Sequence, residues 1–510
     1  MKKYIVGFAL VVLVSALFFA KYTGDDTISS SERTPAESST AVFGTDELFT
    51  GSKKVLSDLN NPNVFNARTC AEVVNKVTDY LFYLPANHFI PKTDAEKEQL
   101  KTKGPELLNT VFQIRVTLHE KLKQFDSRNE LESNCIQKIR EGFQYARFTE
   151  EYILDWLYAQ KVYTFKKTPV LIDEQPSTWT NPKFKGFQLQ SGDVMLIRGK
   201  SYVSAMIARI ADEEGNFSHA AIVGEDKAGK KYVVEALIQH GVVVTPLEKW
   251  RQAEDSRVAL FRYPDQALAK KAARYMYDLA QGALDRKQGI RYDFSMNDDD
   301  YSSMFCSEVI RVAYDKASGG KVMIPKFRST TTKFKDHKYP RTLGVTKTSL
   351  FAPYDVEVDP RFDFIAEYRF MPLLRQVRMQ DAVLQSVYSW MIEKGYDFHW
   401  DLGHSSKSYL AKLVRQFGVA KESLPKYMPV ETIKTTVQFE TVAAALEKNI
   451  YKKEAEYYKK NGYLPSFQDM LAINEAFRVQ DCKNGKRFEL PGIDRSQFHG
   501  FFYSDSKSCE

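Results

Sequence analysis

The stretches NFSHAAIVG at residues 216–224 and MFCSEVI at residues 304–310 determine how the rest of this chain is interpreted. The first places His219 on a short apolar run that is typical of a strand, and the second places Cys306 at the start of an apolar run with helical spacing. A thiol nucleophile and its general base are commonly held on two such elements. The sequence therefore predicts a cysteine enzyme if the two side chains meet in space.

The segments around these motifs predict an antiparallel sheet and two helices. Strands bounded by turn residues are expected at 192–199, 217–225, 231–239, 241–247 and 258–264. Residues 201–210 fit a short helix or a further strand. Helices are expected at 265–284, with Asp265 as the N-cap, and from Cys306 to the stop at 318–320. Short turns between successive strands indicate an α+β unit of about 150 residues.

Cys306 is the candidate nucleophile. It is expected in the first turn of its helix, capped by Ser302 or Ser303, where free N–H groups and the helix dipole favour a thiolate over a thiol. The same backbone donors can stabilise an oxyanion. The three aspartates at 298–300 oppose this effect if they point inward, so we expect them to face solvent or to cap the helix.

His219 is the candidate general base, because a reference pKa of about 6.5 lets a histidine gain and lose a proton near neutrality. Its expected orienting partner is Glu235 on the next strand. A hairpin turn centred on Ala228 places His219 opposite Leu237 and makes Glu235 a diagonal neighbour on the same face. A shift of one residue moves Glu235 to the other face.

Taken alone, each of these three residues has an ordinary structural explanation. A lone histidine in an apolar strand is more often part of the core, a cysteine on a buried helix face is usually inert, and a strand glutamate often points to solvent. The prediction therefore depends on their combination and their order in the chain.

Composition argues against several other classes. The net charge of +7 comes from 72 basic and 65 acidic residues spread along the chain, which does not favour nucleic-acid binding. The eight histidines show no convincing pair of metal ligands, and His399 and His404 lack nearby thiols or a carboxylate pattern, so no metal site is predicted. No nucleotide-binding loop is visible, and no cofactor is expected.

Four motifs carry a resemblance to a known family: GDVMLIRG at 192–199, SHAAIVG at 218–224, VVEA at 233–236 and RYDFSMNDDDYSSMFCSEVI at 291–310. Together they resemble the circularly permuted papain-like amidases of the NlpC type, particularly the YiiX/YebB-like group. In the permuted order the histidine precedes the polar third residue, and the cysteine comes last at a helix start. His219, Glu235 and Cys306 match those positions. The resemblance covers about residues 185–320.

The resemblance implies an α+β fold with a permuted papain-like catalytic domain, placed here at residues 185–345. It further implies a Cys-His-Glu hydrolase, in which Cys306 forms a thioester, His219 moves the proton and Glu235 orients the ring. Relatives act on cell-wall peptides or, in the lecithin retinol acyltransferase branch, on fatty-acyl groups.

The leading prediction is an amidase or peptidase for a peptidoglycan peptide or an N-acyl substrate. One alternative is a thiol acyltransferase or lipid esterase. The other is a catalytically inactive scaffold tethered to a membrane.

The N-terminus predicts export. Lys2 and Lys3 precede an uncharged apolar run, so residues 1–21 fit a signal peptide or a membrane anchor, with the rest of the chain outside the cytoplasm. Phe18 stands where a cleaved signal prefers a small residue, which favours a retained anchor. Residues 22–44, rich in serine, threonine and charge, fit a flexible linker. The predicted location is the cell envelope, on its periplasmic side.

Two mostly helical regions, residues 45–165 and 346–510, flank the predicted catalytic domain. The first carries no residue set that looks chemical, so structural support or partner binding is expected there, and both flanks are candidate sites for a protein partner. In the first region, Pro105 is expected in the first turn of a helix and His119 is expected to face solvent. The apolar stripe of that helix comprises Leu107, Val111, Ile114, Leu118, Leu122 and Phe125.

Two further segments border this domain: residues 166–185 fit a linker, and residues 362–370 alternate as a half-buried strand. The five cysteines suggest two disulfides, Cys70 with Cys135 and Cys482 with Cys509, in an oxidising compartment. Cys306 is left as a free thiol.

Overall fold

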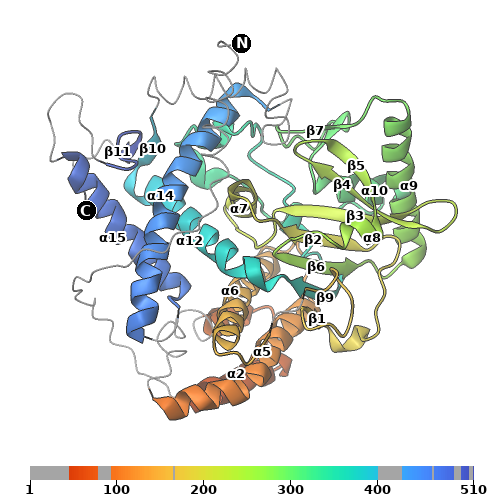
Figure 1. The fold of residues 1–510 in the computed structure, drawn as a ribbon. Coiled ribbons are helices and arrows are strands. Elements are labelled where there is room, and N and C mark those ends of the chain that lie inside the picture. The colour runs from red at the N-terminus through yellow and green to blue at the C-terminus, as the bar shows by residue number, and fades with distance from the viewer. Residues whose placement is uncertain are drawn as a thin grey trace, which may run out of the picture. The chain divides into compact units, whose positions relative to one another are not determined.

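The computed structural model describes residues 45–78, 93–164, 167–399, 428–461, 464–486, 496–504 and 509 (Figure 1). The predicted N-terminal anchor or signal at 1–21 and the predicted linker at 22–44 lie outside these residues. Within the described ranges, no helix combines the length and the apolar character needed to cross a membrane.

A seven-stranded antiparallel sheet forms the centre of the fold (Figure 1). Its strands, in spatial order, are β1 (Thr178–Thr180), β9 (Asp363–Arg369), β6 (Arg257–Arg262), β2 (Val194–Arg198), β3 (His219–Glu225), β4 (Lys231–Leu237) and β5 (Gly241–Pro246). The five strands expected from the sequence all form, because each alternates apolar side chains that enter one of two cores on opposite faces. The α+β prediction is confirmed.

Helices α9 (Gln266–Asp285) and α10 (Glu308–Ser318) pack against each other and on β3. The side chain of Asp265 caps α9 by accepting from the N–H of Leu268, as predicted. Gly319 ends α10 with φ +64°, a left-handed conformation that suits glycine. The ambiguous segment 201–210 forms a helix, α7 (Tyr202–Arg209). Short elements complete this part: η2 (Pro182–Phe184), α8 (Leu247–Trp250), β7 (Arg291–Tyr292), β8 (Ser303–Met304), η3 (Thr332–Phe334), α11 (Tyr339–Thr342) and η4 (Pro353–Asp355).

The region before the sheet contains α2 (Thr45–Asn60), α3 (Cys70–Thr78), α5 (Asp94–Leu122) and α6 (Glu130–Ala159). The predicted apolar stripe of α5 is buried. Two predictions about this helix are wrong. It starts eleven residues before Pro105, at a capping box on Thr93, so the proline lies inside the helix. His119 is buried among Phe143, Phe261 and Phe364, because α5 packs against the sheet as well as against α6.

The region after the sheet contains α12 (Met371–Lys394), α14 (Val430–Asn461) and α15 (Phe467–Lys486), with a small two-stranded sheet of β10 (Tyr396–Phe398) and β11 (Phe502–Ser504). Disulfides join Cys70 to Cys135 and Cys482 to Cys509, and Cys306 is free. Both predicted pairings are confirmed.

Two segments next to the catalytic region differ from their predictions. The segment expected as a linker supplies β1, which pairs with β9. The expected half-buried strand, β9, is buried along almost its whole length, because it lies between β1 and β6 with both faces covered. Both strands lie beyond the predicted domain limits at 185 and 345, and the division of the chain into domains stays a prediction.

A cluster of buried charges joins the flanking helices to the sheet. Arg115 of α5 donates to Glu150 of α6 (2.8 Å) and to Glu367 of β9 (2.9 Å), and Arg369 bonds the same two carboxylates. The members of this ion-pair cluster are Arg115, Arg147, Glu150, Glu151, Arg198, Arg257, Glu357, Glu367, Arg369 and Asp381, all at most 5% exposed.

Candidate active site

His219 and Glu235 lie on adjacent strands and contact each other. Ala221 pairs with Glu235 in the β3–β4 ladder, so the register is the one centred on Ala228, and Glu235 is the diagonal neighbour of His219. The ring nitrogen Nε2 of His219 lies 2.7 Å from Oε2 of Glu235. This contact fixes the ring orientation and leaves Nδ1 for a second partner.

Cys306 lies two residues before α10 rather than in its first turn, so the predicted helix start is wrong. Strand β8 keeps the chain extended through Ser303 and Met304, and the helix begins at Glu308. Neither predicted cap is used: Ser302 donates to Asp300, and Ser303 belongs to β8. The thiol therefore sits in the turn that leads into the positive end of the helix.

The structure brings the three predicted residues together. The Sγ atom of Cys306, a residue only 3% exposed, lies 3.7 Å from the carbonyl oxygen of Ser218, the neighbour of His219. Burial alone lowers the pKa of His219, but hydrogen bonds and charge interactions with Cys306 and Glu235 outweigh burial and raise the pKa to about 10. The imidazole thus lies between a thiol and a carboxylate and is favoured in its protonated form.

Tyr292 is a site residue that the sequence did not identify. Burial is the main cause that raises the pKa of its hydroxyl, and its interaction with the thiol of Cys306 adds to this rise. The side chain arrives there because β7 pairs in parallel with β8, just before the cysteine. Tyr292 belongs to the motif that carried the resemblance, yet a two-residue pairing has no periodicity that would reveal it.

The aspartates before the cysteine only partly follow the prediction. Asp299 and Asp300 are exposed, with Asp299 paired to Lys347 (2.7 Å). Asp298 is buried, contrary to expectation, because Arg311 and Lys326 both bind its carboxylate. Its charge is therefore neutralised locally and does not oppose a thiolate at Cys306.

Two further carboxyl groups near the site have raised pKa values. Burial is the main cause that raises the pKa of Glu308 to about 8. The N–H of Phe305, which donates to the carboxylate (3.3 Å), opposes this rise, and the negative charges of Asp293, Asp300 and Asp299 add to it. Burial is the main cause that raises the pKa of Asp255 to about 6; its charge also interacts with His219 and Glu235. Both groups titrate in the range where a cysteine hydrolase works.

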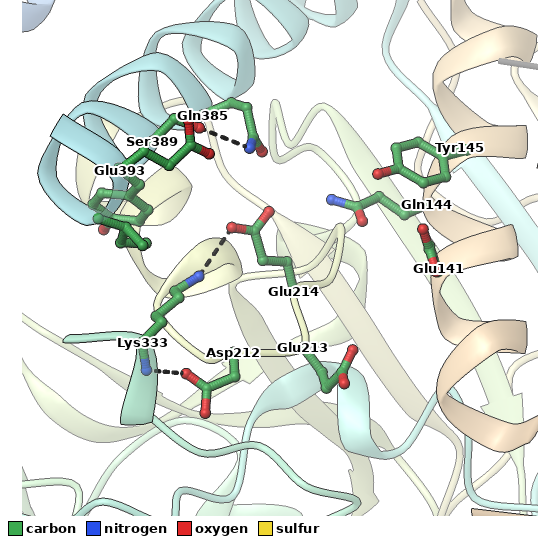
Figure 2. Close-up of a pocket in the computed structure, with 12 residues that line it drawn as sticks. Glu141, Gln144, Tyr145, Asp212, Glu213, Glu214, Lys333, Gln385, Ser389 and Glu393 are labelled. Carbon is green, nitrogen blue, oxygen red and sulfur yellow. Dashed lines mark hydrogen bonds and ion pairs between the residues drawn. The ribbon is translucent and has the colours of Figure 1, made fainter. Parts of the chain in front are cut away.

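A cavity of about 330 Å³ lies between α6, the loop at 212–214, η3 and α12 (Figure 2). Five of its twelve lining residues are acidic. Figure 2 shows one of them, Glu214, paired with Lys333 (3.0 Å). Neither cysteine nor histidine lines this cavity, so it offers no nucleophile with a base. Among the residues that the structure describes, no group of three or more histidine, cysteine or acidic side chains is arranged to hold a metal ion.

Residues 188–357 match the model of a family described as the permuted papain-like amidase enzymes, YaeF/YiiX, C92 family. A solved structure titled as the metalloprotein yiiX from Escherichia coli O157:H7 is 21% identical, covering 34% of this chain and 96% of that chain with a TM-score of 0.26. No curated protein matches the chain. The predicted resemblance to the YiiX-like group is confirmed over the matched residues, and it is a resemblance to amidases.

Proposed function

We propose that the permuted papain-like segment at residues 188–357 is a cysteine amide hydrolase with Cys306 as nucleophile, His219 as acid and base, and Glu235 as the residue that orients the ring. The observation that carries this proposal is the position of His219, whose Nε2 lies 2.7 Å from Glu235 while the same ring interacts with Cys306. A nucleophile, a base and an orienting carboxylate in that order are what thiol-dependent acyl transfer requires.

The first half of the reaction forms a thioester. Cys306, as the thiolate paired with the His219 imidazolium, attacks the carbonyl carbon of the amide and gives a tetrahedral oxyanion. Two donors are available to that oxyanion: the hydroxyl of Tyr292 and the backbone N–H of Cys306, which has no acceptor among the described residues. His219 then gives its proton to the leaving nitrogen, the C–N bond breaks, and the amine departs.

The second half regenerates the thiolate of Cys306. His219, now neutral, takes a proton from water while the water oxygen attacks the thioester carbonyl. The C–S bond breaks, the carboxylic acid leaves, and Cys306 and His219 return to the thiolate–imidazolium pair. Glu235 keeps its contact with Nε2 throughout, which favours the imidazolium in the free enzyme.

We further propose that the substrate is a cell-wall peptide or an N-acyl amide outside the cytoplasm. The apolar N-terminal run after Lys2 and Lys3 supports export, and the disulfides Cys70–Cys135 and Cys482–Cys509 suit an oxidising compartment. The same thioester can pass to an alcohol or amine acceptor, so a thiol acyltransferase differs from this hydrolase only in the acceptor.

The test is turnover of muropeptides and N-acyl amides by wild type, Cys306→Ala and His219→Ala, with intact-mass detection of the acylated protein. We expect wild type to release amine and acid, and Cys306→Ala to form no acyl adduct. Hydrolysis that persists in Cys306→Ala, or an adduct on another residue, contradicts the proposal. Acyl transfer to an added amine in preference to water identifies the transferase.

A further inference from the structure

Helix α6 contacts the catalytic segment three residues before His219. Arg147 of α6 donates through Nη1 to the side-chain oxygen of Asn216 (2.7 Å), and its guanidinium lies over the ring of Phe217, 4.7 Å from the ring centre. All three side chains are at most 2% exposed. This contact is buried, and α6 lies outside the residues that match the amidase family.

A second arginine holds the backbone of the same residue. Arg257 of β6 donates to the carbonyl oxygen of Asn216 (3.3 Å), and Glu151 of α6 holds that guanidinium with two hydrogen bonds, one of them 2.7 Å long. Helix α6 therefore holds Asn216 in two ways. Arg147 bonds its side chain directly, and Glu151 positions Arg257, which bonds its backbone carbonyl.

The other end of the segment is fixed by the catalytic sheet. The N–H of Ser218 donates to the carbonyl of Ile197 (2.9 Å), and the carbonyl oxygen of Ser218 lies 3.7 Å from Sγ of Cys306. Only Phe217 separates this residue from Asn216, so a displacement of Asn216 is transmitted to Ser218 and to His219. An error of about 1 Å in such a geometry can slow a reaction on the order of a hundredfold.

Charge balance alone does not require the contact with Asn216. Arg147 already binds Glu357 (2.5 Å) and Glu367 (3.1 Å), which leaves Nη1 for a neutral amide oxygen. We propose that Arg147 is a positioning residue: through it, with Glu151 acting through Arg257, helix α6 holds residues 216–219 so that His219 meets Cys306 and Glu235. The proposal rests on the function proposed above and assigns the helical flank a role in catalysis.

The main test variant is Asn216→Ala, which removes the acceptor and leaves Arg147 paired with both carboxylates. The readouts are the rate at which iodoacetamide alkylates Cys306 across pH, the kcat and KM on any substrate found, and the thermal unfolding midpoint. We expect alkylation near neutral pH and kcat to fall about 10- to 100-fold, with KM little changed. The pH profile of alkylation should move toward that of His219→Ala.

The control is Arg378→Met, which breaks a buried ion pair between α12 and Asp155 of α6 and removes no hydrogen bond to residues 216–219. It should lower the unfolding midpoint and leave the alkylation profile of the folded protein unchanged. Arg147→Lys and the double variant Arg147→Lys/Asn216→Ala complete a cycle, in which the second substitution should add little to the first because both remove one contact.

Three outcomes overturn the proposal: wild-type alkylation of Asn216→Ala, an equal shift in Arg378→Met, or additive effects in the cycle. Failure of the proposed function gives a different set of results. If no substrate turns over but alkylation of wild type depends on His219, the positioning role is still measured by alkylation. If wild-type alkylation is independent of His219, both proposals fall.

Discussion

Two sets of buried ionisable groups lie close together in this protein, and they are built differently. In the ion-pair cluster, each arginine faces fixed carboxylates; Glu367, for example, accepts from Arg115, Arg147 and Arg369 and is fully buried. At the candidate active site, one histidine lies between a thiol and a carboxylate, and its side chain is 19% exposed. In the first set each charge faces fixed partners of opposite sign, whereas in the second a proton can move between the partners.

This difference distinguishes buried charges that stabilise the fold from buried groups that can transfer a proton. In a pair of fixed opposite charges, removing one partner leaves the other charge buried and uncompensated, which destabilises the fold. A group whose partner is itself titratable keeps a mobile proton and can act as an acid and a base. Substitutions in the two sets should therefore affect different measurements.

The largest expected effect is the loss of activity in Cys306→Ala. Removal of the nucleophile should lower kcat/KM by at least about a thousandfold, because no other group can form the thioester. The unfolding midpoint should change little, since Cys306 lies outside the ion-pair cluster and the substitution removes one sulfur atom. Steady-state kinetics and thermal unfolding on the same preparation check this. A large loss of stability with retained activity would reverse the roles assigned to the two sets.

The second expected effect is on stability and belongs to the ion-pair cluster. Glu150→Gln removes the carboxylate shared by Arg115 and Arg369, so the free energy of unfolding should fall by about 3 to 5 kcal/mol. Urea unfolding measures this loss, and kcat of the remaining folded protein should stay close to wild type. Glu72→Gln is the control, because its pair with Lys76 is exposed and its loss should leave unfolding unchanged. Equal stability of the two variants contradicts the structural role of the cluster.

His119 supplies a third kind of buried group, one without an opposite charge, and its effect should be smaller over an accessible pH range. Burial, with a smaller contribution from Lys123, lowers the pKa of His119 to about 3. The unfolded chain takes up a proton below pH ~6.5 while the folded protein does not. The contribution of His119 to the free energy of unfolding is therefore fully present above pH ~6.5. It decreases by about 1.4 kcal/mol per pH unit as the pH is lowered toward 3.

The measurement for His119 is the free energy of unfolding at several pH values between 7 and 4.5. His119→Phe should show a shallower decline than wild type, since it removes the group that titrates on unfolding. The phenylalanine has aromatic neighbours on three sides, which makes it a reasonable packing replacement. Parallel curves for the two proteins would mean that His119 is protonated in the folded state.

The sequence predicted the parts of this fold and site that depend on local signals. Strands β2 to β6 follow turn residues and alternation, and the hairpin centred on Ala228 sets the register that joins His219 to Glu235. The Asp265 cap and the disulfide pairings were also recognisable. The register depends on neighbours within one hairpin, and the disulfide pairings depend on the number and positions of the cysteines.

The features that were missed depend on partners distant in sequence. Strand β9 was expected to be half-buried, but Glu367 is enclosed because arginines from α5 and α6 neutralise it across more than 200 residues. Asp298 is buried for the same reason, next to Arg311 and Lys326. The late start of α10 depends on the parallel pairing of β7 with β8, which a helical period does not reveal. Charge pairing outside the local sequence thus accounts for two of the errors.

The smallest predicted effect concerns Glu308, a buried carboxyl group next to the candidate active site. Its pKa of about 8 means that the carboxyl is mostly neutral at pH 7 and becomes charged above pH 8. The new charge lies two residues from Cys306 and disfavours both the thiolate and the oxyanion, so kcat/KM should decline two- to fivefold between pH 7 and 9, on the order of 0.5–1 kcal/mol. The glutamine in Glu308→Gln cannot ionise and still accepts from the N–H of Phe305. The kcat/KM of this variant should therefore stay constant with pH until His219 loses its proton near pH 10. If the variant declines like wild type, the alkaline limb belongs to another group, and Glu308 serves only to hold the turn before α10.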